Sequence, residues 1–145
     1  MPILQAGKLV PMFTLPTSDG NRTVQRQDLR GKAALLLLWM PPHEETTNHY
    51  LAQLDHELAT WGDQQRALVI SDDDLPDMNH ALTLHDANHA VAAHFFDQNE
   101  AKGAWFITDR YGELFAQGTA NSIADLPAPA TFTEWIEYVN MRCSG

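Results

Sequence analysis

Sulfur, positive charge and long apolar runs are all scarce in this sequence. The only cysteine among the 145 residues is Cys143, which excludes an intramolecular disulfide and a cysteine-based zinc or iron–sulfur site. Lys and Arg number 9 against 19 Asp and Glu, and the net charge of −10 argues against nucleic acid or an anionic membrane as a partner. The longest apolar run, residues 33–40, is far shorter than the roughly 20 residues that cross a bilayer. The start of the chain lacks the pattern of a secretory signal, so we expect a cytoplasmic protein.

What is present is the composition of an ordinary folded domain. Apolar residues make up 44% of the chain, and Gly and Pro number 8 each, which excludes disordered and collagen-like classes. A chain of this length buries about two-thirds of the surface that its unfolded form exposes, so it needs no disulfide or metal to fold. We find no repeat or linker and predict one domain over residues 1–145.

The first half of the chain predicts a hairpin followed by a strand–helix–strand unit. Residues 12–15 and 23–25 flank a turn at 18–21, and residues 28–31 predict one helical turn closed by Gly31. The run 33–39 and the segment 67–70 predict buried strands. Between them, one helical face is formed by Leu51, Leu54, Leu58 and Trp61, in a helix with Thr46 as its N-cap and Gly62 at its end.

The second half predicts a helix, a hairpin and a last helix. Asp86 is the expected N-cap of a helix over residues 86–95, and the segments 105–108 and 113–116 flank a turn at 109–112. Phe132, Trp135, Ile136 and Val139 have helical spacing, and we expect Trp135 and Ile136 in the core. The whole order predicts an α/β fold: a three-layer α/β/α sandwich with a mixed central sheet, helices on both faces and an N-terminal β-hairpin.

An ordered set of motifs resembles the thioredoxin-like redoxins. The set covers most of the chain: Gly7-x-x-x-Pro11-x-Phe13-x-Leu15, Asp28-Leu29-Arg30-Gly31-Lys32, the apolar strand ending at Trp39, Ile70-Ser71-Asp72, residues 86–95, and the hairpin from Phe106 to Leu114. These redoxins include the peroxiredoxins, the alkyl hydroperoxide reductase and thiol-specific antioxidant family. The resemblance implies a thioredoxin-like fold and an oxidoreductase family.

Redoxins react through a cysteine thiolate, but the matching positions of this sequence hold no cysteine. In the thioredoxin pattern Trp-Cys-x-x-Cys, which begins at Trp39, the cysteine positions hold Met40 and His43. In the peroxiredoxin pattern Pro-x-x-x-Thr-x-x-Cys, Pro42 and Thr46 match, but His49 stands at the peroxidatic cysteine.

Two further marks of the family are missing. Gly103 occupies the position where thioredoxins have a cis-proline and peroxiredoxins an arginine. Glu44 and Glu45 add negative charge to the loop that should favour a thiolate. We therefore predict a redox-silent member with no catalytic residue and no cofactor, acting as a binding or regulatory module.

The former active-site loop is the predicted binding region. We expect residues 40–43 to face the segment starting at Gly103 across a shallow groove, widened because glycine has no side chain. A protein partner or an extended peptide would lie in this groove, and a homodimer is the other expected assembly.

Two alternatives remain open at this stage. One is an antioxidant thiol peroxidase or disulfide oxidoreductase with a non-standard route. The other is a histidine-based metal protein, for which the best cluster is His43, Glu44, Glu45 and His49. For His85 and His89, and for the acidic turn 72–74, we favour a polar, solvated surface over a metal site. We expect Cys143 to be a packed residue at a helix end, not a functional thiol.

Overall fold

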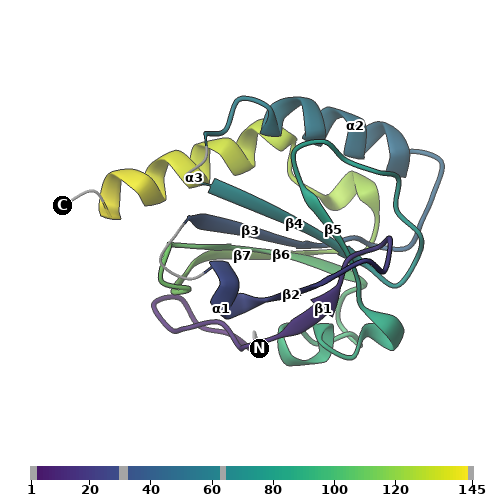
Figure 1. Ribbon diagram of the computed structural model, residues 1–145, viewed down its shortest axis with the longest axis horizontal. Helices are drawn as coiled ribbons and strands as arrows, with labels where there is room; N and C mark the ends of the chain where they lie inside the picture. The colour runs from purple at the N-terminus through teal and green to yellow at the C-terminus, as the bar shows by residue number, and fades with distance from the viewer. Residues whose placement is uncertain (1–2, 30–32, 63–64, 144–145) are drawn as a thin grey trace.

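A computed structural model describes residues 3–29, 33–62 and 65–143 (Figure 1). The strands are β1 (Thr14–Pro16), β2 (Thr23–Gln25), β3 (Ala34–Trp39), β4 (Gln65–Ser71), β5 (Leu82–His85), β6 (Gly103–Thr108) and β7 (Leu114–Ala120). The α-helices are α1 (Arg26–Leu29), α2 (Thr47–Leu58) and α3 (Pro129–Cys143). Short 3-10 turns occur at η1 (Ala87–His89), η2 (Ala92–His94) and η3 (Ile123–Asp125).

The central sheet is mixed, with strand order β5-β4-β3-β6-β7. β3 and β4 are parallel and are joined through α2, while β6 and β7 are antiparallel neighbours. At the sheet centre Leu37 pairs with Leu68 on one side and Phe106 on the other. β1 and β2 form a separate antiparallel hairpin. The predicted mixed sheet, its parallel pair and the N-terminal hairpin are confirmed.

Alternating side chains of β3 supply two separate cores. Leu36, Leu38 and Met40 belong to one core, which is completed by residues of α2 and α3. Leu37 and Trp39 belong to the other, which is completed by residues of the hairpin and of the segment after β5. A strand buried on both faces explains why this run is continuously apolar.

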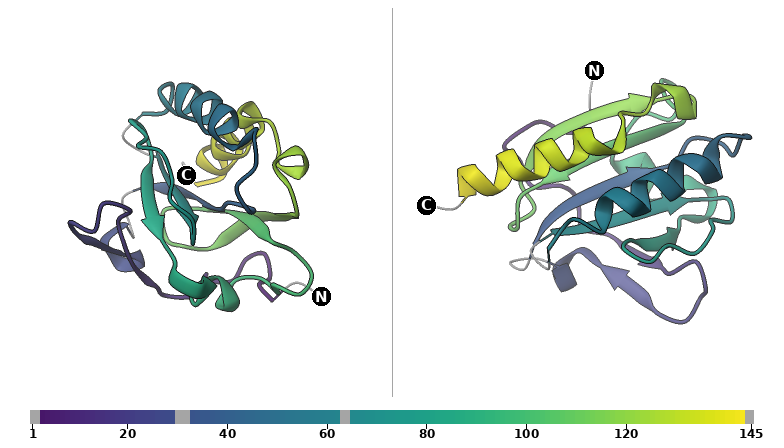
Figure 2. Two further views of the ribbon diagram at one scale, coloured as in Figure 1. Left: turned by 90° about the vertical axis from the view of Figure 1, so that its right-hand side faces the viewer. Right: turned by 90° about the horizontal axis from the view of Figure 1, so that it is seen from above.

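Both long helices lie on the same face of the sheet (Figure 2). The opposite layer consists of the β1–β2 hairpin, α1 and the 3-10 turns η1 and η2. The three-layer arrangement is confirmed, but the predicted helix over residues 86–95 is wrong. The backbone of Asn88 and His89 is left-handed (φ 57° and 55°), which interrupts any α-helix there.

Two predictions about helix α3 and its neighbour have different outcomes. Ile136 is 2% exposed, so its place in the core is confirmed. Trp135 is only half-buried. The reason is that α3 packs over β3 and β6, which leaves the Trp135 side chain beside the start of β7. Leu51, Leu54 and Leu58 are buried on α2 as expected. α2 ends at Leu58 rather than near Gly62, and Trp61 packs against α3 by donating its indole N–H to Thr133 Oγ1 at 2.8 Å.

Other elements differ in smaller ways from the sequence prediction. The predicted helical turn corresponds to α1, while Gly31 lies outside the described residues. β5 was not predicted at all, and it pairs with β4 in parallel. In the described part of the chain, no helix has the length and apolar content to cross a membrane.

Candidate functional site

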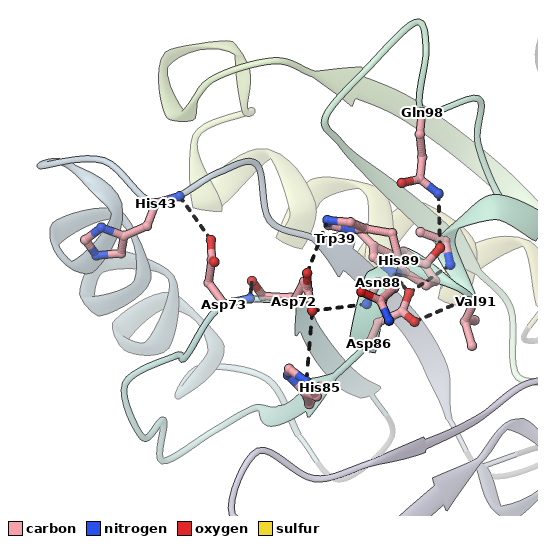
Figure 3. A network of polar contacts seen from close by, with 12 residues as sticks. Trp39, His43, Asp72, Asp73, His85, Asp86, Asn88, His89, Val91 and Gln98 are labelled. Atoms are coloured by element: carbon pink, nitrogen blue, oxygen red, sulfur yellow. Dashed lines mark hydrogen bonds and ion pairs between the residues drawn. The ribbon is translucent and has the colours of Figure 1, made fainter.

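The β3–α2 loop is anchored by its buried half and exposed at its tip. Trp39 and Met40 are 1% and 3% exposed, and the Met40 N–H donates to Ile70 O at 2.9 Å, continuing the pairing of β3 with β4. Pro42 and His43 are exposed. The backbone N–H of His43 donates to Asp73 Oδ2 at 3.4 Å, which ties the loop tip to the end of β4 (Figure 3).

The start of α2 separates the two family patterns. Thr46 is the N-cap residue, as predicted, but its hydroxyl donates to Glu44 Oε1 at 3.0 Å instead of capping the helix. The hydroxyl of Thr47 accepts the Glu44 N–H at 2.9 Å. His49 is exposed in the first helical turn, whereas Met40 and His43 precede the helix. The peroxiredoxin alignment therefore places its cysteine position at the helix N-terminus, where a dipole would favour a thiolate.

A cleft of about 260 Å3 opens beside this loop. It lies at the carboxyl ends of β3 and β4, where ligands bind in open α/β sheets. Its lining residues are Met40, Pro42, Ser71, Asp72, Asp73, His89, Gln98, Ala101 and Lys102. Its lining combines charges of both signs, from Asp72, Asp73 and Lys102, with the apolar side chains of Met40 and Ala101.

One wall of the cleft is a cluster centred on the Asp72 carboxylate (Figure 3). Asp72 Oδ1 accepts the Asn88 N–H at 3.1 Å. The Nε2 atoms of His85 and His89 lie 4.0 and 3.9 Å from its two oxygens. The His89 carbonyl accepts the Gln98 side-chain N–H at 3.0 Å. Two consecutive left-handed residues without glycine are uncommon, although Asn and His enter this region more readily than most other residues.

Asp86 supports this wall from within the protein. The side chain is 1% exposed, and its oxygens accept three hydrogen bonds, from Trp39 Nε1 at 3.1 Å, Val91 N at 3.0 Å and Ala92 N at 2.8 Å. The predicted role as a helix cap is thus replaced by a bridge between β3 and the turns after β5. A buried carboxylate is tolerated here because donors surround it.

Gly103 does not widen a groove. A Cβ atom placed on Gly103 would lie 2.6 Å from Trp39 O and 2.8 Å from Pro41 N, so the strand start rests directly on the loop backbone. The expectation of a wider groove at this position is wrong, because the absence of a side chain is used for close packing. The cleft instead has Ala101 and Lys102 as one wall, immediately before Gly103.

The remaining candidate residues are not assembled into a site. Among the residues that the structure describes, no group of three or more His, Cys, Asp or Glu side chains could hold a metal ion, which includes the cluster around His43 and His49. Cys143 ends α3, on the side of the molecule opposite the β3–α2 loop (Figure 1).

The sequence analysis missed Asp86, Gln98 and Lys102 as parts of the site. A signal existed for Asp86, because polar residues that follow parallel strands meet at one edge of a sheet. The sequence pattern does not predict β5, so it does not group Asp86 with the residues that follow β3 and β4. Gln98 and Lys102 lie outside the helices and strands, where no periodic pattern of residues predicts the position of a side chain.

Comparisons with known proteins agree on the architecture. The 2-Cys peroxiredoxin of Plasmodium vivax aligns with a TM-score of 0.78 and 17% identity over 98% of this chain and 100% of that one. The protein has the thioredoxin-like fold. AhpC of Enterococcus faecalis gives a TM-score of 0.76 (14% identity, 94% of this chain and 92% of that one), and the exposed lipoprotein thioredoxin Etrx1 of Streptococcus pneumoniae gives 0.69 (12% identity, 88% and 99%).

Far fewer proteins match this thioredoxin-like protein by sequence than by structure. No protein-family model matches the chain. A segment of 39 residues is 46% identical to the thiol:disulfide interchange protein DsbE of Pseudomonas fluorescens, covering 27% of this chain and 22% of that protein. The resemblance inferred from the motifs is thus confirmed as a shared thioredoxin-like fold in a chain with a single cysteine.

Proposed function

We propose that this thioredoxin-like protein is a redox-silent binding or regulatory module whose cleft beside residues 40–42 takes an extended segment of a protein partner. The observation that carries the proposal is the placement of sulfur. Met40, His43 and His49 occupy the positions where the fold would hold a nucleophilic cysteine, and Cys143 ends a helix on the opposite side of the molecule. A thiolate is the nucleophile in both peroxide reduction and disulfide reduction, and a thioether or imidazole does not replace it.

The charges near the loop support the same conclusion. Redoxin thiols need a nearby cation or helix dipole to ionise. Here the loop carries Glu44 and Glu45, and the facing end of β4 carries Asp72 and Asp73. Lys102 is the one Lys or Arg among the described residues that line the cleft. These acidic residues would oppose the support that the helix N-terminus gives to a thiolate.

The shape of the cleft favours a peptide-sized ligand. A volume of about 260 Å3 is slightly smaller than a usual small-molecule pocket and suits one or two side chains of an extended chain. Gln98, Lys102 and Asp73 provide a donor–acceptor pair, a cation and an anion around its rim. Such groups recognise main-chain amides and polar side chains of a partner.

Two activity assays test the redox part. Peroxide consumption with dithiothreitol and insulin reduction should stay at the rate without protein. Turnover that disappears in Cys143→Ser would show that Cys143 is a nucleophile and would overturn the proposal. Turnover that survives in Cys143→Ser would also overturn it, in favour of an oxidoreductase with a non-standard route.

A matched pair of charge reversals tests the binding part. Peptides selected from a phage-displayed random library would be labelled, and their affinity measured by fluorescence anisotropy. Lys102→Glu should weaken binding about tenfold or more, as expected for a lost charge-assisted contact. Arg110→Glu, an equal charge change on the exposed β6–β7 turn, should not. No enriched peptide, or equal weakening by both variants, would contradict a peptide-binding cleft. The cytoplasm remains the predicted location.

A further inference from the structure

The central sheet is incomplete where β4 begins. The pairing of β4 with β5 starts only at Leu68 and Leu82, so residues 65–67 have no strand beside them on that side within the described part of the chain. A pocket of about 480 Å3 opens there, between the start of β4, the segment before β5 and the chain that follows α2. Its volume is that of an ordinary small-molecule site. It shares no lining residue with the cleft beside residues 40–42 and lies at the opposite end of β4.

The charge of this pocket is opposite to that of the chain. Arg22, Arg66 and His80 line it, and none of the described residues in its lining is acidic, although the chain has 9 Lys and Arg against 19 Asp and Glu. Within the described residues no ion pair is formed by either arginine, and the Arg66 Nη1 makes only a long bond to Gln65 O, at 3.5 Å. Guanidinium groups bind carboxylate and phosphate oxygens through paired N–H donors, so this lining suits an oxyanion.

Apolar side chains form the other side of the pocket. Leu58 belongs to the core on the helix side of the sheet, and Trp61 and Ala81 pack against it. The Trp61 N–H is donated to Thr133 Oγ1 at 2.8 Å, and the rest of its ring is apolar carbon. Arg66 shares its strand face with residues of the hairpin-side core, because alternate residues of a strand lie on one face. The pocket therefore has a cationic side toward the hairpin and an apolar side toward the helices.

Backbone hydrogen bonds hold this lining in place. The Asp55 carboxylate on α2 accepts the His80 N–H at 2.8 Å, which ties the segment before β5 to the helix. The Thr17 N–H donates to Arg22 O at 2.9 Å, and Thr17 bridges to Leu84, which ties the hairpin to β5. These contacts use the backbone of His80 and Arg22, while their side chains line the pocket. The site is thus formed before a ligand enters it, which lowers the cost of binding.

We propose that this pocket binds a small aromatic oxyanion, a carboxylate or a phosphate monoester, with its charged group at Arg22 and Arg66 and its ring against Trp61. A pocket lined by charge of one sign attracts the opposite charge, so an anion is favoured over a cation. His80 supplies a further N–H donor. The ring gains from the burial of apolar surface and from contact with the indole. The proposed redox-silent function does not depend on this site, because the cleft has a separate lining.

Isothermal titration calorimetry on the full chain tests the proposal with α-naphthyl phosphate and α-naphthoate. At least one of them should bind saturably with a Kd below about 1 mM, and the tighter of the two identifies the charged group. Inorganic phosphate, which lacks the ring, and α-naphthol, which lacks the anion, should each bind about tenfold or more weakly. No saturable binding of either aromatic anion would overturn the proposal, as would equal affinity for inorganic phosphate or for α-naphthol.

A matched pair of charge reversals locates the site. Arg66→Glu should weaken the tighter probe about tenfold or more, because a carboxylate replaces one of the two guanidinium groups. Arg110→Glu makes the same charge change on the exposed β6–β7 turn and should leave the affinity unchanged. Equal weakening by the two variants would show a general effect of charge and overturn the proposal. Weakening by Lys102→Glu in place of Arg66→Glu would put the probe in the cleft and also overturn it.

A second pair of variants tests the apolar side. Ala81→Leu adds bulk to the lining and should weaken the probe about tenfold or more, since it fills the space of the ring. Ala93→Leu adds the same bulk at an exposed position of η2 and should not weaken it. Circular dichroism checks that each variant is folded. Unchanged affinity in both Arg66→Glu and Ala81→Leu would show that the probe binds elsewhere and would overturn the proposal.

Discussion

The indole Nε1–H of Trp39 donates a hydrogen bond to Asp86 Oδ2 at 3.1 Å, across 47 positions of the sequence. Trp39 ends the central strand β3, and Asp86 follows β5 two strands away. The bond therefore fixes the distance between the loop that begins the cleft and the turns that form its far wall.

Loss of the Asp86 carboxylate should be strongly destabilising. Asp86→Ala leaves the Trp39, Val91 and Ala92 donors unsatisfied, and we expect unfolding free energy to fall by about 3 kcal/mol or more. Asp97→Ala is the control, because the Asp97 carboxylate accepts an exposed bond from Asn99 N at 2.9 Å and should cost less than about 1 kcal/mol. Urea unfolding measures both. Similar losses in the two variants would contradict the structural role of Asp86.

A methyl group at Gly103 should also be costly. The added Cβ of Gly103→Ala would lie 2.6 Å from Trp39 O, so backbone must move, and we expect a loss of about 1–3 kcal/mol in unfolding free energy. At Gly62 the nearest atom to such a Cβ is Gln65 Oε1 at 3.9 Å, and Gly62→Ala should be close to neutral. If Gly103→Ala were equally well tolerated, the close approach of β6 to the loop would be refuted.

Tyr50 should make stability depend on pH in the alkaline range. Burial raises the pKa of Tyr50 above its ordinary value of 10.0, and its hydroxyl donates to Pro127 O at 2.7 Å. The folded protein keeps this proton where the unfolded chain releases it, so the stabilisation is complete below about pH 10 and declines as pH rises above it.

Unfolding in urea at about pH 8 and about pH 10.5 measures this effect. Tyr50→Phe should reduce the decline between the two values, whereas Tyr111→Phe, at an exposed tyrosine, should leave it unchanged. An equal decline in Tyr50→Phe and the parent protein would show that other groups cause it.

A pair of cysteine variants on α2 tests the electrostatics of the position that matches the peroxidatic cysteine in the sequence pattern. His49 lies in the first turn and His56 in the last, and both are exposed. In a Cys143→Ser background, the thiol pKa of His49→Cys should be lower than that of His56→Cys by about half a unit, since the helix dipole favours the thiolate at the N-terminus. The pH dependence of alkylation reports both values. An equal or inverted order would mean that Glu44 and Glu45 outweigh the dipole.

The sequence predicts those parts of the fold whose cause is local. The turn at residues 109–112 and the apolar run of β3 specify a hairpin and a doubly buried strand, and both are present. The segment 86–95 has helical spacing, yet Asp86 binds Trp39 and two nearby amides instead, and no local pattern contains a partner 47 residues away. β5 was missed because it is short, with only Leu84 fully buried.

The candidate site divides in the same way. Residue types identify the loop of Met40 and His43 and the absence of its cysteines. The other walls of the cleft come from Asp72, Gln98 and Lys102, which only the folded sheet brings to that loop. Gly103 shows most clearly what the sequence alone does not decide, because a glycine is equally compatible with an open space and with a close contact.

The leucine run of β3 makes the two faces of this strand nearly equivalent. Leu35 to Leu38 present the same side chain to both sides, so a slip of the strand by one residue would leave the leucine positions chemically unchanged. Trp39 breaks this equivalence, since its ring lies 4.6 Å from Phe95 and its N–H meets Asp86 on one face only. The indole thus distinguishes the two faces of the central strand, and we expect exchanges of Leu for Met or Ile within the run to cost less than loss of the Trp39 ring.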